Sequence, residues 1–438
     1  MRIANSVGLG VLVMIGAAVV AADNPLVAPA GPAFEKLVKQ LGDSNGKVRE
    51  QASQQLQDLG PAILPRLKAA KDGADPEVRG RLAALVLALE KAPLLQPKRV
   101  SLQLRDKTIR EAIAELAKQT GYKIDLYPNG NDDRDKHLHS FNFDQTPFWA
   151  AVDKLCQQGG LSLQRTYGDD QRLQLRFDDT YVPFVSNADA FRLTAQGFQY
   201  HRTIEFSALP RNASATGQRG ESLQFRFTIM GEPRLPMLWV GPVTLTEAVD
   251  ERGNSLIPPP APGDADRQGF HDRSFYHDAW TNLVRPARDA EMVKRLRGTV
   301  PVRVLVEQTP EIVLENPKAG KGQKLKSDST ELDVEDFKEA AGGRQGYELK
   351  FNVRSLRSDG TEYHFYNSIR HRFELQDAKG NKYGWSGGGW GGNENSVRGT
   401  FNFSHPGGEV GPPVKLILYG WTTIYHRVPF EFRDLPLP

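Results

Sequence analysis

Histidines and carboxylates most often carry catalysis or hold metals, and in this chain their spacing indicates neither. None of the nine histidines belongs to a His-Glu-x-x-His pattern or to a Cys/His array of metal-binding spacing. The best metal candidate is His137 with His139, beside Asp132, Asp133 and Asp135, because alternating strand residues face the same way. A solvated loop accounts for the same residues. We therefore predict no metal site.

Other catalytic signatures are also missing from the sequence. It contains no Gly-x-Ser-x-Gly motif and no phosphate-binding loop, and the stretch from Gly320 to Lys324 is expected to be a linker. The single cysteine, Cys156, lies on the apolar face of an expected helix and is interpreted as a small buried hydrophobe. We predict no catalytic residue and no cofactor. Paired carboxylates that meet only in space remain open, and with them a hydrolase.

The sharpest local feature is a run of aromatic residues and glycines from Tyr383 to Gly392. If this run is a mobile loop, Trp385 and Trp390 have few partners and stay exposed, which suits stacking on sugar rings or on a partner's apolar surface. Alternatively, the glycines let a strand twist closely while both indoles fold back onto the sheet. Tyr383, Trp385 and Trp390 are the candidate contacts for a ligand or partner, with a glycan as one candidate.

The charge balance excludes some classes of partner. The chain has 438 residues with 56 basic and 53 acidic side chains, a formal net charge of +3, and no long block of one sign. A nucleic-acid or polybasic membrane-binding surface is therefore not indicated. The length fits about three domains of ordinary size.

The N-terminus has the pattern of an export signal. Arg2 precedes an apolar run over residues 7–20, and the small residues before Asp23 fit a cleavage rule. The apolar run is short for a transmembrane helix. We predict that residues 1–22 are a signal peptide. The mature chain is then expected to start at Asp23, to lack a transmembrane segment, and to reside in the periplasm or at the cell surface.

Two similar strand-helix-strand patterns follow one another within residues 99–178. The first has a capping box, formed by Thr108 and Glu111, at the start of its helix. The second is expected to begin its helix with Thr146 as N-cap and Pro147 in the first turn, and a hairpin closes the unit. We expect a compact sheet with two helices on one face. The predicted core comprises Leu102, Leu104, Ile113, Leu116, Phe141, Trp149, Val152 and Leu175.

This unit resembles the short N-terminal domain of secretins and TonB-dependent receptors. The match is carried by Leu104-Arg-Asp106, Glu111-Ala-Ile, Leu116-Ala-Lys-Gln-Thr-Gly121 and Trp149-Ala-Ala-Val-Asp-Lys-Leu155. These are core and turn residues, so the match concerns fold more than function. The resemblance implies a periplasmic docking or signalling module at residues 98–178 that has no active site.

Residues 32–93 have helical apolar spacing in four short segments separated by Gly, Pro and Asp clusters. The segments from Asp43 to Ala52 and from Asp75 to Arg81 resemble HEAT-type helical repeats. Two such repeats are few for a solenoid, which needs about three to bury a continuous core. We therefore expect the helical pair to lean on another part of the chain, most simply the following domain.

From residue 180 onward alternating apolar residues predominate, as in residues 223–229. Short strands separated by Gly, Pro and Asn clusters favour antiparallel sandwiches. An internal duplication is visible, since the Asp-x-x-Gly-Asn sequence at Asp250 recurs at Asp377. Each is expected to be a hairpin turn whose glycine has a positive φ. We predict two similar sandwiches, at residues 180–315 and 316–438.

These features predict a multidomain α+β protein. It comprises a short helical repeat pair, a twinned βαβ domain with a small sheet, and two antiparallel β-sandwich domains. The predicted function is that of a non-enzymatic binding or scaffold protein that docks envelope proteins through its helical and βαβ modules. The alternative is a secreted hydrolase or carbohydrate-binding protein acting through the β-sandwich region. A hydrolase would require carboxylates or a His/Asp pair to meet in a deep cleft.

Overall fold

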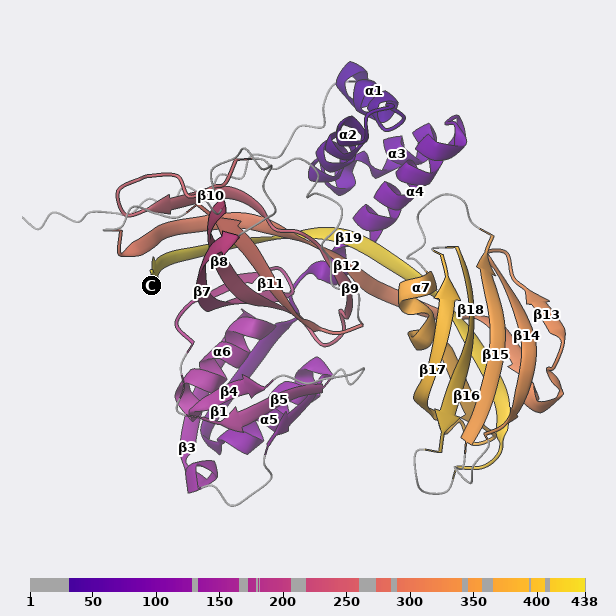
Figure 1. Ribbon diagram of the computed structural model, residues 1–438. Helices are drawn as coiled ribbons and strands as arrows, with labels where there is room; N and C mark the ends of the chain where they lie inside the picture. Colours follow the sequence, from indigo (N-terminus) through magenta and orange to yellow (C-terminus); the bar gives the residue numbers. More distant parts are fainter. Residues whose placement is uncertain are drawn as a thin grey trace, which may run out of the picture.

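The computed structural model describes residues 31–437 apart from 128–132, 165–171, 179, 181, 206–217, 260–272, 285–289, 341–345, 357–364, 394 and 406–409. The predicted signal peptide lies outside the described residues. Within them the chain is a mixed α+β protein in which strands predominate and form several sheets. Figure 1 shows a helical segment, a mixed unit of strands and helices, and two regions of sheet.

Helices form the first part of the fold. They are α1 (Gly31–Gln40), α2 (Gly46–Asp58), η1 (Pro61–Ile63), α3 (Leu64–Asp72), α4 (Pro76–Lys91) and η2 (Ala92–Leu95). α1 contacts α2 and α3 contacts α4, so the helices form two pairs as expected. They enclose a small core that includes Phe34, Leu41, Leu56, Leu67, Leu82 and Leu89.

Polar caps start α2 and α4, and apolar residues near the end of the helical segment join it to the sheets. The Asn45 side chain accepts a hydrogen bond from the backbone at the start of α2, and Asp75 accepts two at the start of α4. Leu87 of α4 packs against a larger core built by the sheets, and Leu95 of η2 is buried in it. The helical segment therefore leans on the sheets.

The unit at residues 99–178 has its helices and strands in the predicted order. They are β1 (Arg99–Thr108), α5 (Ile109–Thr120), β2 (Lys123–Leu126), η3 (Asp133–Lys136), β3 (Leu138–Pro147), α6 (Phe148–Gly159), β4 (Leu161–Gln164) and β5 (Arg172–Phe177). The strands form two sheets. β1 pairs antiparallel with β3, while β5 lies between the parallel β2 and the antiparallel β4. The prediction of one sheet is wrong because β3 pairs with β1 and leaves the shorter strands to a second sheet.

The two helices of this unit begin differently, and only the start of the first was predicted correctly. At the start of α5, the Glu111 N–H donates to Thr108 Oγ1 over 3.2 Å, and the Thr108 N–H donates to Glu111 over 2.9 Å. The predicted capping box is thus confirmed. α6 begins at Phe148, with Pro147 as its N-cap residue and no side-chain cap. The predicted Thr146 cap is wrong because β3 continues through Pro147.

The core of the unit is close to the predicted one. Leu104 is only partly buried, because β1 shifts register against β3 directly after it. The other predicted core residues are buried together: Leu102, Ile113, Leu116, Phe141, Trp149, Val152 and Leu175. α5 contacts β1 and β2, and α6 contacts β3 and β4, so each helix bridges the two small sheets.

The remaining strands form three larger groups. A four-stranded sheet has the order β11-β8-β7-β6, with β6 (Val185–Ala188), β7 (Phe191–Glu205), β8 (Gln218–Gly231) and β11 (Tyr276–Leu283). A five-stranded sheet has the order β13-β14-β15-β18-β17, with β13 (Gln323–Lys326), β14 (Thr330–Glu339), β15 (Gly346–Ser355), β17 (Gly384–Gly392) and β18 (Ser396–Ser404). Between them lies the central sheet, β10-β12-β19-β16, with β9 (Met237–Val240), β10 (Thr244–Asp250), β12 (Met292–Glu315), β16 (Phe373–Asp377) and β19 (Pro413–Pro436). The short helices here are η4 (Pro317–Ala319), α7 (Phe365–Ser368) and η5 (Ile369–His371).

The central sheet is shared by two cores. β12 and β19, each of 24 residues, pair antiparallel along nearly their whole length, and Figure 1 shows them running side by side from one region of sheet to the other. One part faces the four-stranded sheet, where the rings of Phe227 and Phe430 are 5.4 Å apart. The other part faces the five-stranded sheet, where Phe351 and Phe373 are 4.8 Å apart. The last strand therefore contributes to both cores.

The two Asp-x-x-Gly-Asn turns form the same hydrogen bonds. The N–H of Asn254 donates to the Asp250 carboxylate over 2.8 Å, and the N–H of Asn381 donates to Asp377 over 2.8 Å. The side-chain amides of these asparagines donate to the second carboxylate oxygen over 2.8 and 2.9 Å. The glycine of each turn has a positive φ, 84° and 82°, as predicted. The duplication seen in the sequence thus extends to the hydrogen bonding of these turns.

We expect the carboxylate of Asp377 to make the fold sensitive to acid. Burial by itself raises its pKa, but hydrogen bonds from Asn381 and from the backbone N–H groups of Gly411 and Lys379 lower the pKa to about 2. The ordinary value is about 3.9. Because the folded-state pKa is the lower one, this stabilisation is complete above about pH 4 and is lost as the pH falls toward 2.

We therefore expect the thermal unfolding midpoint to fall as the pH is lowered from about 4 to about 2. Asp377→Asn should lower the midpoint at neutral pH and flatten this decline, because the amide has no carboxyl group to protonate. Unfolding followed by circular dichroism across this pH range measures both effects. Identical acid slopes for the two proteins would contradict the assignment.

Candidate functional site

The run of glycines and tryptophans is an edge strand. Residues 384–392 form β17, which pairs with β18 at the edge of the five-stranded sheet. Gly388 and Gly392 have φ values of 142° and 147°. A Cβ at these positions would come within 2.2 and 2.0 Å of carbonyl oxygens of β18. The glycines therefore permit close strand pairing, and the interpretation as a flexible loop is wrong.

Two of the three predicted contact residues are largely covered. Tyr383 is buried in the core, and its hydroxyl donates to the Gly411 carbonyl. The Trp390 Nε1–H donates to the Tyr366 carbonyl over 2.9 Å, and its ring meets Phe401 edge-on with centroids 5.7 Å apart. These two side chains help to close the core, as the alternative interpretation of the sequence expected.

Trp385 differs, because 43% of it is exposed. Its ring also meets Phe401 edge-on, with centroids 6.5 Å apart, and the Arg370 guanidinium lies 6.0 Å from its centroid. Tyr366 of α7, a helix that contacts β17, is 42% exposed. We call Trp385, Tyr366 and Arg370 the tryptophan edge. Its exposed indole, with the Arg370 cation nearby, can contact a flat ring or an apolar partner surface.

The two tryptophans should respond differently to substitution. Trp390→Ala should lower the free energy of unfolding by about 2 kcal/mol, because it removes both core packing and a hydrogen bond. Trp385→Ala should change it by less than about 0.5 kcal/mol, as expected for an exposed side chain. Urea unfolding measures both, and a larger loss for Trp385→Ala than for Trp390→Ala would contradict the placement of the indoles.

A buried carboxylate joins the βαβ unit to the four-stranded sheet. Glu232, directly after β8, is 0% exposed. It accepts hydrogen bonds from the Lys98 N–H over 2.8 Å, the Tyr122 hydroxyl over 2.6 Å and Arg234 Nε over 3.1 Å. Burial and the charge of Glu232 raise the pKa of Tyr122, so the phenol stays protonated and keeps donating. No motif marks Glu232 in the sequence, because its partners Lys98 and Tyr122 lie far from it in the chain.

Further contacts connect the βαβ unit to the four-stranded sheet. The buried Trp149 of α6 donates from Nε1 to the Ala190 carbonyl over 3.1 Å. Arg192 of β7, 7% exposed, donates from Nε to Asp153 of α6 over 2.7 Å. Met230, at the end of β8, is buried in the core of the βαβ unit. The unit and the sheet therefore share a packed boundary. We call this boundary, including the contacts of Glu232, the Glu232 joint.

A second buried charge lies near the other core. Arg372 is 0% exposed, donates from Nε to Ser368 over 2.8 Å, and places its guanidinium 4.9 Å from the centroid of the Trp421 ring. Burial raises the pKa of Glu311, but hydrogen bonds from Ser329 and Ser327 and the charge of Arg372 lower it overall. Glu311 therefore remains ionised and acts as a fixed acceptor rather than as an acid.

The described residues of the candidate metal site do not come together in the structure. His137 is exposed, His139 stacks on Phe141 with ring centroids 6.0 Å apart, and Asp135 pairs with Arg110 over 2.7 Å. Asp132 lies outside the described residues. In the part of the chain that the structure describes, no group of three His, Cys, Asp or Glu side chains is placed to hold a metal ion.

Cys156 packs against the core of the βαβ unit as a small apolar group. Burial, helped by the nearby charge of Asp153, raises the pKa of its thiol to about 12. The thiol therefore stays protonated at neutral pH and is a poor nucleophile.

Comparison with models of known protein families finds no match for this chain, and neither does comparison with curated proteins. Among the described residues, no helix is both long enough and apolar enough to cross a membrane.

Proposed function

We propose that the protein is a non-enzymatic binding or scaffold protein outside the cytoplasm that docks envelope proteins through its helical segment and its βαβ unit. The observation that carries this proposal is the Glu232 joint. It holds the βαβ unit firmly while leaving two large apolar side chains of that unit in solvent, Tyr127 at 60% and Leu138 at 62% exposure. A unit that is fixed on one side and exposes apolar groups elsewhere is suited to dock a partner.

The sequence patterns supply the rest of the proposal. The basic residue and apolar run of residues 1–22 favour export, and residues 98–178 are similar to the docking module of secretins and TonB-dependent receptors. Residues 32–93 are similar to a HEAT-type pair, a class of fold that offers extended binding surfaces. Two sandwiches, at residues 180–315 and 316–438, complete the proposed layout. β12 and β19 each extend from one sandwich into the other. We place a second contact, for a glycan or for an apolar partner surface, at the tryptophan edge.

The test is retention of envelope proteins on the immobilised chain that starts at Asp23. A Tyr127→Ser, Leu138→Ser double variant should lose the retained partner, because it removes both exposed apolar groups. Val313→Ser is the matched control, since Val313 is 41% exposed and lies on β12 near the other core. If the double variant and the control retain the same proteins, the docking proposal fails.

A further inference from the structure

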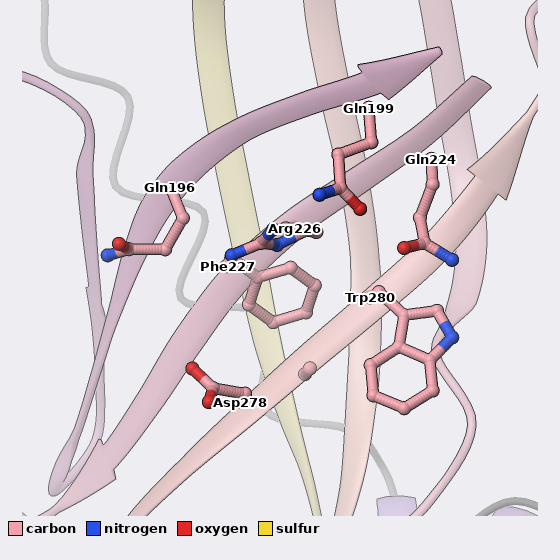
Figure 2. A pocket seen from close by; sticks show the side chains of 8 residues that line it. Gln196, Gln199, Gln224, Arg226, Phe227, Asp278 and Trp280 are labelled. Atoms are coloured by element: carbon pink, nitrogen blue, oxygen red, sulfur yellow. The ribbon is translucent and has the colours of Figure 1, made fainter. Parts of the chain in front are cut away.

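The outer face of the four-stranded sheet contains a hollow with a volume of about 380 Å³. Its size is within the range of small-molecule sites, roughly 300–1,000 Å³. Figure 2 shows the side chains around it, which come from β7, β8 and β11. Those on the outer face are Gln196, Gln199, Gln224, Arg226, Asp278 and Trp280.

The strand register brings these side chains together. Gln199 lies opposite Gln224, and Arg226 lies opposite Trp280 on the neighbouring strand. Successive residues of a strand point to opposite faces. Phe225 and the other inward residues of β8 fill the core, so the residues between them point outward.

A local irregularity adds one more side chain. Ala195 and Gly197 pair with consecutive residues of β8, so Gln196 is an extra residue in β7. Gly197 has a φ of 142°, which allows the strand to bend there. The exposed Gln196 lies at this bulge and lines the hollow.

The hollow lies beside the Glu232 joint. The row of side chains that contains Arg192 and Met230 is covered by the βαβ unit. The next row on the same face contains Thr228 and Asp278, which lie opposite each other on β8 and β11. Asp278 lines the hollow. The βαβ unit thus covers one end of the face, next to the hollow.

We propose that this hollow binds a neutral oligosaccharide. Trp280 lines the hollow and supplies a flat indole on which the C–H face of a sugar ring can stack. Each glutamine side chain both donates and accepts hydrogen bonds, as sugar hydroxyls do. Arg226 supplies donors and Asp278 supplies acceptors, and their charges offset one another.

Other classes of ligand fit less well. A charged ligand would meet one cation and one anion among the described residues that line the hollow, so neither sign is favoured. A stable protein interface buries about 800 Å² on each partner around an apolar centre. The hollow instead has a single outward aromatic ring among five polar side chains. This inference does not rest on the docking function, because it uses none of the residues placed in that role.

The test is isothermal titration of the chain from Asp23 onward with hexasaccharides of β-1,4-linked glucose, xylose, mannose and N-acetylglucosamine, and with hexagalacturonate as the anionic comparison. At least one neutral hexasaccharide should bind, with a dissociation constant on the order of 1 mM or tighter. Trp280→Ala should weaken that binding at least about tenfold, because the stacking surface is lost. Binding of no neutral hexasaccharide, or preference for hexagalacturonate, overturns the proposal.

Two further variants decide where the sugar binds. The double variant Gln224→Ala, Arg226→Ala removes outward polar groups and leaves the core intact. It therefore tests sugar binding in the hollow even if Trp280→Ala does not fold. It should also weaken binding at least about tenfold. Trp385→Ala tests the tryptophan edge in parallel. If Trp385→Ala abolishes binding and the two hollow variants do not, the sugar site is at the edge and the inference about the hollow is wrong.

Discussion

Replacing Glu232 by alanine should lower the free energy of unfolding by about 3–5 kcal/mol, the cost typical of breaking a buried ionic network. The carboxylate is 0% exposed and accepts hydrogen bonds from Lys98, Tyr122 and Arg234. Alanine leaves the Lys98 N–H and the Tyr122 hydroxyl without this acceptor in a part-buried site, and it removes the carboxylate that faces Arg234, whose side chain is 32% exposed. Glu232→Gln should lower the free energy of unfolding by less, because the carbonyl oxygen of the amide still accepts hydrogen bonds. Its remaining cost comes from losing the negative charge that faces Arg234.

Urea unfolding measures the loss, and hydrogen exchange shows where it occurs. In Glu232→Ala we expect the amides of residues 99–178 to lose protection relative to those of β12 and β19. The matched control is Glu335→Ala, which removes the Glu335–Arg398 ion pair of 2.8 Å on an exposed surface. Such a pair contributes about 1 kcal/mol or less. Equal losses in Glu232→Ala and Glu335→Ala would show that the joint does not hold the unit.

The parts of the fold that the sequence predicted correctly depend on residues close together in the chain. The capping box from Thr108 to Glu111 needs four residues, and the turns at Asp250 and Asp377 need five. The helical spacing of residues 32–93 and the core of the βαβ unit follow from periodicity within single elements. In each case the hydrogen bonds or the apolar face are complete within one segment.

The parts that the sequence did not predict depend on which strands pair. Alternation shows that residues 300–306 form a strand, but it does not show that β12 pairs with β19 more than a hundred residues later. The same holds for β1 and β3, whose pairing divides the expected single sheet in two. A division of the chain into consecutive sandwiches therefore could not anticipate two cores that share their central strands.

The candidate sites show the same limit. The composition of β17 left open whether its indoles are exposed or fold back onto the sheet, and only its pairing with β18 explains the glycines and the cover over Trp390. The six outward side chains of the hollow come from three strands, and the sequence between β8 and β11 separates them. Gln196 reaches the hollow only because of a bulge. No local pattern could have assembled that set.

Leu116→Ala should lower the free energy of unfolding by about 2–5 kcal/mol, through lost transfer energy and the cavity left behind. Leu116 is 0% exposed in the middle of α5 and lies in the core that also contains Leu102, Phe141 and Trp149. Alanine is a better helix former than leucine, so the loss cannot come from helix propensity. Both small sheets contact the same two helices, so we expect the whole βαβ unit to lose protection from hydrogen exchange.

The neighbouring residue provides the control. Glu115 lies on the same helix, with 40% of its side chain exposed, and forms an ion pair of 3.7 Å with Lys118. Glu115→Ala should change the free energy of unfolding by less than about 0.5 kcal/mol. The comparison separates burial from helix propensity, since both variants place alanine in consecutive positions of α5. If urea unfolding gives the same midpoint for Leu116→Ala, Glu115→Ala and the unmodified chain, Leu116 does not fill the core of a packed unit, and the assignment of residues 99–178 fails with it.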